Sequence, residues 1–151
     1  MIVPDKILEK AAEKIIEILI DKYDKLGMRA SGKWAESLEG RTRPNSVYVY
    51  GEKYTEQLTK GRGPSERIPP VNKIYQWMQD KKNFRGEKTL SRAYAIAHTI
   101  RKEGTSWYQA GGSDLMEILE DEDVLDEFYK IIGEEIKIEI SKILVRDLKN
   151  M

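Results

Sequence analysis

Residues 4–28, PDKILEKAAEKIIEILIDKYDKLGM, decide the fold of this chain. Apolar side chains recur at every third or fourth position of this stretch, and Lys and Glu fill most positions between them. That spacing places the apolar side chains on one face of an α-helix, so we predict a long amphipathic helix over 5–28. Ile16, Ile18 and Ile20 widen the apolar face beyond a single seam, which indicates contacts with more than the chain's own core.

The segments after this helix predict a small β region. Residues 46–51, SVYVYG, are β-branched and aromatic and too few for anything but a strand. Residues 29–38 predict a short helical piece, and residues 39–45 predict a loop because they contain Gly, Pro and Asn. Residues 53–59 fit either an extended or a helical segment, and residues 60–65, KGRGPS, predict another loop.

Helical spacing returns in the second half of the chain. The apolar residues of 71–78 predict one helix, which a basic loop over 81–88 follows. A further helix is predicted from about residue 89 to Gly104, because glycine takes the left-handed conformation at a helix end with little cost. Residues 105–113 predict a loop that contains two aromatic residues and a glycine pair.

An acidic run and a long apolar series end the sequence. Residues 115–119 predict a helical turn, and residues 124–148 predict a final helix in which Gly133 is a weak point. The alternating isoleucines of residues 134–143 also fit a strand, although the length of the segment and its Lys and Glu content favour a helix.

These segments predict an α+β fold with a long N-terminal amphipathic helix, a small antiparallel sheet and several further helices, including a C-terminal one. The length of 151 residues fits one domain. We expect a single domain over 1–151, made of the helix over 5–28, a central α+β region over 29–105 and an acidic helical region over 106–151. No apolar run approaches the roughly 18 residues of a membrane span, and the first residues lack a secretory pattern, so we expect no membrane partner.

The absence of cysteine and the single histidine narrow the possible chemistry. Without cysteine the chain has no disulfide, no thiolate nucleophile and no Cys-based zinc or iron–sulfur site. His98 is the only imidazole, and the positions one helical turn away from it carry no carboxylate. We therefore expect no enzymatic activity, no cofactor and no metal.

The charges are unevenly distributed although the chain is neutral overall. Residues 29–105 carry 16 basic and 8 acidic side chains, whereas residues 106–151 carry 5 basic and 12 acidic ones. A neutral total argues against a dedicated nucleic-acid-binding protein. Two interpretations remain open: both regions are solvated surfaces, or the basic surface of one copy contacts the acidic surface of the next.

Two motifs resemble ligand-binding loops without meeting their requirements. Residues 61–65, GRGPS, lack the Gly-Lys-Ser/Thr ending of a nucleotide-binding loop, which favours a tight surface turn that holds Arg62 outward. Residues 120–123, EDED, lack the alternating oxygen ligands and the glycine of a calcium loop. Their acidic side chains instead favour the positive N-terminal end of the following helix.

A basic loop carries Lys81, Lys82, Arg85 and Lys88 around Phe84. Such a loop is solvated in most proteins, and we favour that interpretation. The alternative is contact with a nucleic-acid backbone, because cations and an aromatic ring together suit DNA. If several copies surround a central hole, these four cations are candidate contacts for DNA that passes through the channel.

Several motifs in this order resemble one protein family. Tyr54 followed by residues 58–64 resembles a Tyr…(Glu/Lys)-Gly-Arg-x-Pro element. Residues 74–82 resemble an Ile-x-x-Trp-Ile…Lys-Gly helix end without its glycine, and residues 91–105 resemble an Ala-Tyr-Ala-Ile…Ile-x-x-(Glu/Asp)-Gly-Thr element. Over residues 32–105 the chain is similar to the neck and tail-completion (head–tail joining) proteins of tailed bacteriophages, and most similar to those of Bacteroides-infecting and crAss-like phages.

The resemblance implies a structural role in the virion, without catalysis. It implies a head–tail connector subunit, repeated in a sixfold or twelvefold ring, that joins portal and head-closure or adaptor proteins to the tail. The implied location is the neck or tail of the virion, after assembly in the cytoplasm of the host bacterium. Nucleic-acid binding through the basic middle region is the alternative function. Arg and aromatic residues dominate interface energetics, so the candidate inter-subunit contacts are Tyr54, Arg62, Pro64, Trp77, Trp107 and Tyr108, unless the aromatic ones belong to the chain's own core.

Overall fold

The computed structural model describes residues 2–149, and the side chains of all of these except residues 139, 140, 143–145, 147 and 148. The elements in chain order are α1 (Asp5–Lys25), α2 (Lys33–Ser37), β1 (Glu39–Arg43), β2 (Ser46–Tyr50), α3 (Thr55–Lys60), α4 (Val71–Asp80), α5 (Leu90–Glu103), α6 (Ser106–Gln109), the 3₁₀ helix η1 (Met116–Glu120) and α7 (Glu122–Lys149). This arrangement confirms the predicted α+β fold, with long helices at both ends of the chain and a small antiparallel sheet.

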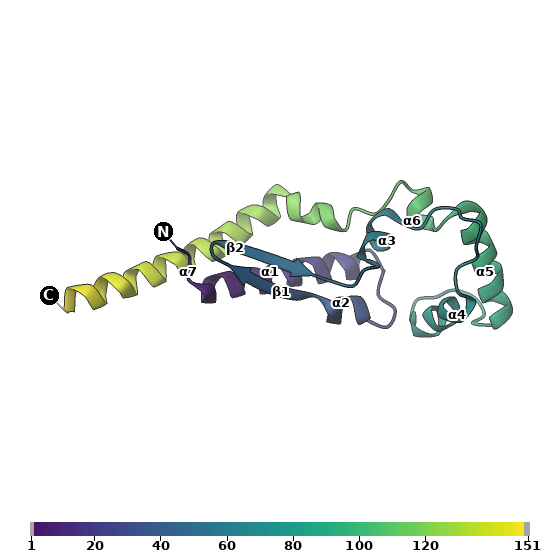
Figure 1. The fold of residues 1–151 in the computed structure, drawn as a ribbon, viewed down its shortest axis with the longest axis horizontal. Helices are drawn as coiled ribbons and strands as arrows, with labels where there is room; N and C mark the ends of the chain where they lie inside the picture. Colours follow the sequence, from purple (N-terminus) through teal and green to yellow (C-terminus); the bar gives the residue numbers. More distant parts are fainter. Residues whose placement is uncertain (1, 150–151) are drawn as a thin grey trace.

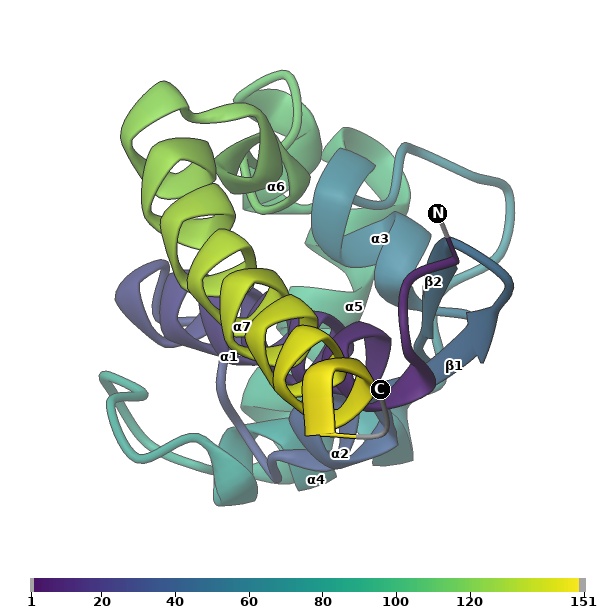
Figure 2. The same cartoon turned by 90° about the vertical axis from the view of Figure 1, so that its left-hand side faces the viewer.

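The molecule is elongated, and α1 lies at the centre of one half of it. The C-terminal part of α7 forms one end of the molecule, and the α4–α5 pair forms the other (Figure 1). The end-on view shows α7 and the β1–β2 hairpin on different sides of α1 (Figure 2). Ile16, Ile18 and Ile20 are half-buried. Contacts with both strands, η1 and α7 therefore account for much of the wide apolar face of α1 within the chain.

β1 and β2 form a two-stranded antiparallel hairpin in which Glu39 pairs with Tyr50. The prediction of a loop over residues 39–45 is wrong, because only Pro44 and Asn45 form the turn. Asn45 has a φ of 56°, in the left-handed region that Asn tolerates better than most residues. The residues of β1 have a low intrinsic propensity for β structure, and they form a strand because they pair with β2.

The hairpin packs on α1 through its inward face. A Cβ at Gly40 would lie 2.6 Å from the Cβ of Ala12, so a glycine is needed for β1 to lie this close to the helix. Thr42, Val47 and Val49 are half-buried on the same face, because alternate residues of a strand point to the same side. The other face of the hairpin is exposed.

The main core lies where the C-terminal half of α1 meets α2 and η1. Tyr23 of α1 and Trp34 of α2 are buried with ring centroids 4.7 Å apart, and Leu115 is fully buried beside them. The indole N–H of Trp34 donates a hydrogen bond of 2.8 Å to Oγ1 of Thr55, so the polar atom of this buried ring has a partner. The core thereby links α1 and α2 to the start of α3.

Several predicted boundaries change in the structure. α1 ends at Lys25, not at residue 28, since Gly27 takes a φ of +69° that stops the helix. The open choice over residues 53–59 resolves as the helix α3. The prediction of a loop over 105–113 is wrong for α6, a single turn in which the Thr105 hydroxyl accepts a hydrogen bond from the Tyr108 N–H.

α7 is one continuous helix over Glu122–Lys149, so the alternative of a strand over 134–143 is wrong. It is joined to α1 by an ion pair of 2.9 Å between Lys10 and Glu135. The hydrogen bond from Lys10 lowers the pKa of Glu135 below its usual value. Ile140, a member of the predicted apolar series, lies outside the described side chains.

Candidate docking cleft

A cleft of about 1020 Å³ lies between the body of the molecule and the α4–α5 pair. One wall comes from the turn that follows α1 and from α3, and the other comes from α4 and α5. Residues 104–109, which lead into and include α6, line the cleft as well. Nearly half of the chain's elements therefore contribute to this one cleft.

The far wall is a pair of helices with a small core of its own. Met78 of α4 is fully buried together with Ala93 and Ala97 of α5, and the two alanines allow the helices to approach closely. Thr89 caps α5 through its hydroxyl, which accepts a hydrogen bond of 3.1 Å from the Arg92 N–H. The α4–α5 pair packs chiefly on itself, so its position depends on a few ties to the body.

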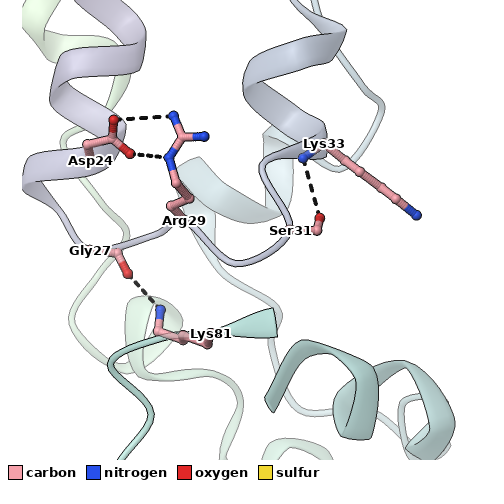
Figure 3. A network of polar contacts seen from close by, with 6 residues as sticks. All are labelled: Asp24, Gly27, Arg29, Ser31, Lys33 and Lys81. Carbon is pink, nitrogen blue, oxygen red and sulfur yellow. Dashed lines mark hydrogen bonds and ion pairs between the residues drawn. The ribbon is translucent and has the colours of Figure 1, made fainter. Parts of the chain in front are cut away.

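The first tie joins the end of α4 to the end of α1. Nζ of Lys81 donates a hydrogen bond of 2.6 Å to the carbonyl of Gly27 (Figure 3). The same ammonium lies 5.2 Å from the ring centroid of Trp77, within cation–π range. Next to Gly27, Arg29 forms two hydrogen bonds to Asp24, at 2.6 and 3.2 Å, which hold the turn after α1 (Figure 3). Burial lowers the pKa of Lys81.

The second tie joins the glycine-rich loop after α3 to the start of α6. The N–H of Arg62 donates to Oγ1 of Thr105 at 3.0 Å, and the N–H of Thr105 donates to the carbonyl of Arg62 at 2.9 Å. The N–H of Ser65 donates to the carbonyl of Arg101 at 3.1 Å, which fixes the loop to α5 as well. Hydrogen bonds to the start of α6 and to α5 therefore hold the loop in place.

Glycines let this loop close around Tyr108. Gly61 has a φ of +78° and Gly104 has a φ of +82°, and a Cβ at either position would overlap atoms of Tyr108. A Cβ at Gly63 would lie 3.0 Å from the same ring. Gly61 and Gly104 combine a positive φ with this close approach, which only glycine allows. Together with Gly63 they surround Tyr108.

The lining of the cleft combines an apolar surface with positive charge. Four cations line it, Arg62, Lys73, Lys81 and Arg92, and no carboxylate is found among the described residues of the lining. Tyr54 also lines it, and burial raises the pKa of that phenol. The larger apolar side chains of the lining are Leu26, Met28, Leu58, Ile74, Trp77, Ile96, Ile100 and Trp107. Such a surface suits a partner with apolar and acidic side chains.

The structure brings most of the predicted contact residues to this cleft. Tyr54, Arg62, Trp77 and Trp107 line it, although they come from separate segments of the chain. Pro64 and Tyr108 lie in or against the glycine-rich loop beside the cleft, and both are exposed. Arg62, which the sequence places on an outward-facing turn, is half-buried and lines the cleft, and its turn is anchored by hydrogen bonds to Thr105.

The four cations predicted as DNA contacts do not form one group. Lys81 lines the cleft, and Nζ of Lys88 donates to the carbonyls of Gln79 and Lys81 at 3.5 and 3.3 Å. Lys82 and Arg85 are exposed to solvent. Lys81 and Lys88 therefore donate hydrogen bonds to backbone carbonyls, while Lys82 and Arg85 face outward.

Sequence reasoning missed Lys73 and Arg92, which supply half of the positive charge of the cleft. A signal was present, because each lies four residues before an apolar lining residue, Trp77 and Ile96, on the same helix face. What the sequence lacked was the information that α4 and α5 point these faces toward α1 and α3.

A second exposed surface lies on the outward face of the hairpin. The guanidinium of Arg41 lies 5.0 Å from the ring centroid of Tyr50, and that of Arg43 lies 4.9 Å from the ring of Tyr48. The two tyrosine rings are stacked with centroids 6.5 Å apart. We call these four residues the hairpin face.

The described residues form few other candidate sites. In residues 2–149, no group of three or more His, Cys, Asp and Glu side chains is placed to hold a metal ion. His98 is exposed on α5. None of the helices in the described part of the chain combines the length and apolar character needed to cross a membrane. No protein-family model, curated protein or solved structure matches this chain.

Proposed function

We propose that this chain is a structural subunit that acts by binding neighbouring protein chains. Following the order of its sequence motifs, we assign it to a ring in the neck or tail of a tailed-phage virion, between the head and the tail. In this role the chain contacts further copies of itself and the proteins on either side of the ring. No chemical step is required of it.

The observation that carries this proposal is the exposure of the tyrosines. Seven of the eight tyrosines are exposed, and Tyr23 alone is buried. Tyrosine is enriched at protein interfaces, because its ring supplies a large contact area at a small cost in conformational entropy. Exposed tyrosines gather beside the cleft, on the hairpin face and on α7.

The cleft supports the same proposal through the chemistry of its lining. It offers tryptophan, proline, aliphatic side chains and cations, and its described lining contains neither a carboxylate nor an imidazole for proton transfer. Imidazoles and carboxylates are among the side chains that carry acid–base catalysis most often. Binding of an apolar, acidic surface requires only what the lining contains.

The direct test is the size of the purified protein in solution. We expect native mass spectrometry and electron microscopy to show a closed ring, with sixfold or twelvefold symmetry. Mixing with the purified portal or tail protein of the same phage should recruit the ring into a larger complex. A chain that remains a monomer alone and with both proteins would contradict the proposal.

The alternative function is nucleic-acid binding, and the hairpin face favours it. Arg41 and Arg43 lie over two stacked tyrosines, a combination that can bind phosphates and bases together. On this alternative, the Arg41→Gln and Arg43→Gln double variant should lose DNA affinity and reduce the dependence of that affinity on salt concentration. Lys137→Gln on α7 is the matched control, and equal binding by the double variant and the control would exclude the hairpin face.

A further inference from the structure

Within the part of the chain that the structure describes, the cations of the cleft have no ion pair with a carboxylate. Lys73 and Arg92 are exposed on the facing helices α4 and α5, and neither forms an ion pair with a carboxylate in the described part of the chain. Arg62 is half-buried and likewise has no ion pair there. Walls of low dielectric concentrate the field of like charges in a cleft, so the cleft attracts an acidic partner.

α7 carries a face with the complementary character. Glu122, Asp126, Tyr129 and Gly133 follow one another at intervals of four, three and four residues, which places them on one side of the helix. Tyr129 is 63% exposed, the highest value for any aromatic residue in the described part of the chain. Both carboxylates are exposed as well, and neither has an ion pair within residues 2–149. We call these four residues the acidic face of α7.

Neither a close contact nor the backbone conformation requires glycine at position 133 in the described part of the chain. A Cβ added at this position would meet nothing within 4 Å, and no positive φ requires glycine there. Glycine inside a helix costs about 1 kcal/mol relative to alanine. A surface of another molecule that approaches the helix backbone beside Tyr129 would give this glycine a function.

We propose that the cleft of one copy binds the acidic face of α7 of a second copy. Tyr129 enters the apolar part of the cleft near Trp77, and Glu122 and Asp126 face Lys73 and Arg92. The inference rests on the proposed function, since it requires that copies of the chain associate. Beyond that function, the inference specifies the two surfaces through which neighbouring copies bind each other.

Because the proposed ring repeats one contact from copy to copy, the cleft and the acidic face join copies head to tail. The acidic face lies on a helix that runs away from the α4–α5 pair toward the far end of the molecule (Figure 1). A contact between two different surfaces leaves one of each free at the ends of every dimer. Repetition of such a contact closes into a ring or continues as a filament. The charge distribution agrees, with the excess of basic residues in 29–105 and of acidic residues in 106–151.

Two charge reversals test this contact, one on each surface. Lys73→Glu places a carboxylate in the cleft, and Asp126→Lys places a cation on the acidic face. Each variant alone should weaken self-association at least about tenfold in sedimentation velocity or native mass spectrometry. Lys102→Glu on α5 and Glu134→Lys on α7 reverse exposed charges outside the two surfaces, and both controls should assemble as the unmodified chain does.

Mixing the two variants gives the sharpest result. Lys73→Glu retains an intact acidic face, and Asp126→Lys retains an intact cleft. An equimolar mixture should therefore form at least a 1:1 dimer, although each variant alone is dissociated. A mixture that stays dissociated would overturn the proposed contact.

The outcomes separate this inference from the proposed function. If the unmodified chain and both variants form the same ring, the ring stands and the proposed contact is overturned. If the unmodified chain alone is monomeric up to about 1 mM, a dissociation constant that corresponds to only about −4 kcal/mol, but joins a complex with the portal or tail protein, only the proposed contact fails. If it stays monomeric with both of these proteins as well, both proposals fail. A monomeric chain that binds duplex DNA through Lys73 would also overturn the contact and assign the cleft to nucleic acid.

Discussion

Replacement of Gly61 by alanine tests whether the glycine-rich loop is held as the structure shows. Gly61 has a φ of 78° and a ψ of 178°, a conformation that is essentially restricted to glycine and costs another residue about 1–3 kcal/mol. The new Cβ would also overlap the backbone of Tyr108 and approach Oγ1 of Thr105. These atoms cannot move without loss of the two hydrogen bonds between Arg62 and Thr105, worth about 1 kcal/mol each.

The expected loss in free energy of unfolding is about 2–4 kcal/mol. Strain and the two hydrogen bonds destabilise the folded state, and the lower entropy of the unfolded alanine chain offsets only about 0.4–1 kcal/mol of this. Domains of this size are stable by about 5–15 kcal/mol, so Gly61→Ala should still fold. We expect a lower urea midpoint, measured by circular dichroism, with an unchanged slope.

Gly111→Ala is the matched control for Gly61→Ala. Gly111 has a φ of +87°, but a Cβ there would meet nothing within 4 Å, so the control adds backbone strain without overlap. It should cost about 1–2 kcal/mol. Equal losses for the two variants, within about 0.5 kcal/mol, would refute the argument that close packing on Tyr108 fixes the loop.

Three further variants test the core, the first tie of the cleft and α7. Trp34→Phe removes the hydrogen bond to Thr55 and part of a buried ring, so the free energy of unfolding should fall by about 2 kcal/mol in urea titrations; an unchanged value would contradict the packing. Burial lowers the pKa of Lys81 below the 10.5 of the unfolded chain, so between these pKa values the unfolded state binds more protons. The stability of the unmodified chain relative to Lys81→Met should therefore be highest above pH 10.5 and should be lost as the pH falls from 10.5 through the pKa of Lys81 in the folded state. A stability difference that does not change with pH from about pH 8 upward would contradict the burial. Gly133→Ala should raise the free energy of unfolding by about 1 kcal/mol when measured in the Lys73→Glu background, and a loss there would mean that the glycine has a role within its own chain.

Most of the helices were predictable because their hydrophobic spacing is strong and local. α1, α4, α5 and α7 each repeat apolar residues over several turns, and Gly104 marks the end of α5 in sequence and structure alike. β1 was not predictable, since Glu39–Arg43 contains a single β-branched residue. It forms a strand because it pairs with β2 and packs on α1. α6 was missed because four residues carry no measurable periodicity, and only the capping hydroxyl of Thr105 signals it.

The cleft was predictable as a set of residue types but not as a place. Arg62 and Trp77 stand out in the sequence as candidate contacts, yet their meeting in one lining depends on single long-range hydrogen bonds. Lys81 is 54 residues from Gly27, whose carbonyl it reaches, and no periodicity in the sequence encodes such a pair. From the sequence alone, a lysine at the end of a helix that carries a tryptophan is interpreted as a solvated charge, because most lysines of folded proteins are exposed. The fold instead places Lys81 between the two walls, where its partly buried charge both holds the cleft together and contributes to the positive field that we propose attracts α7 of the next copy.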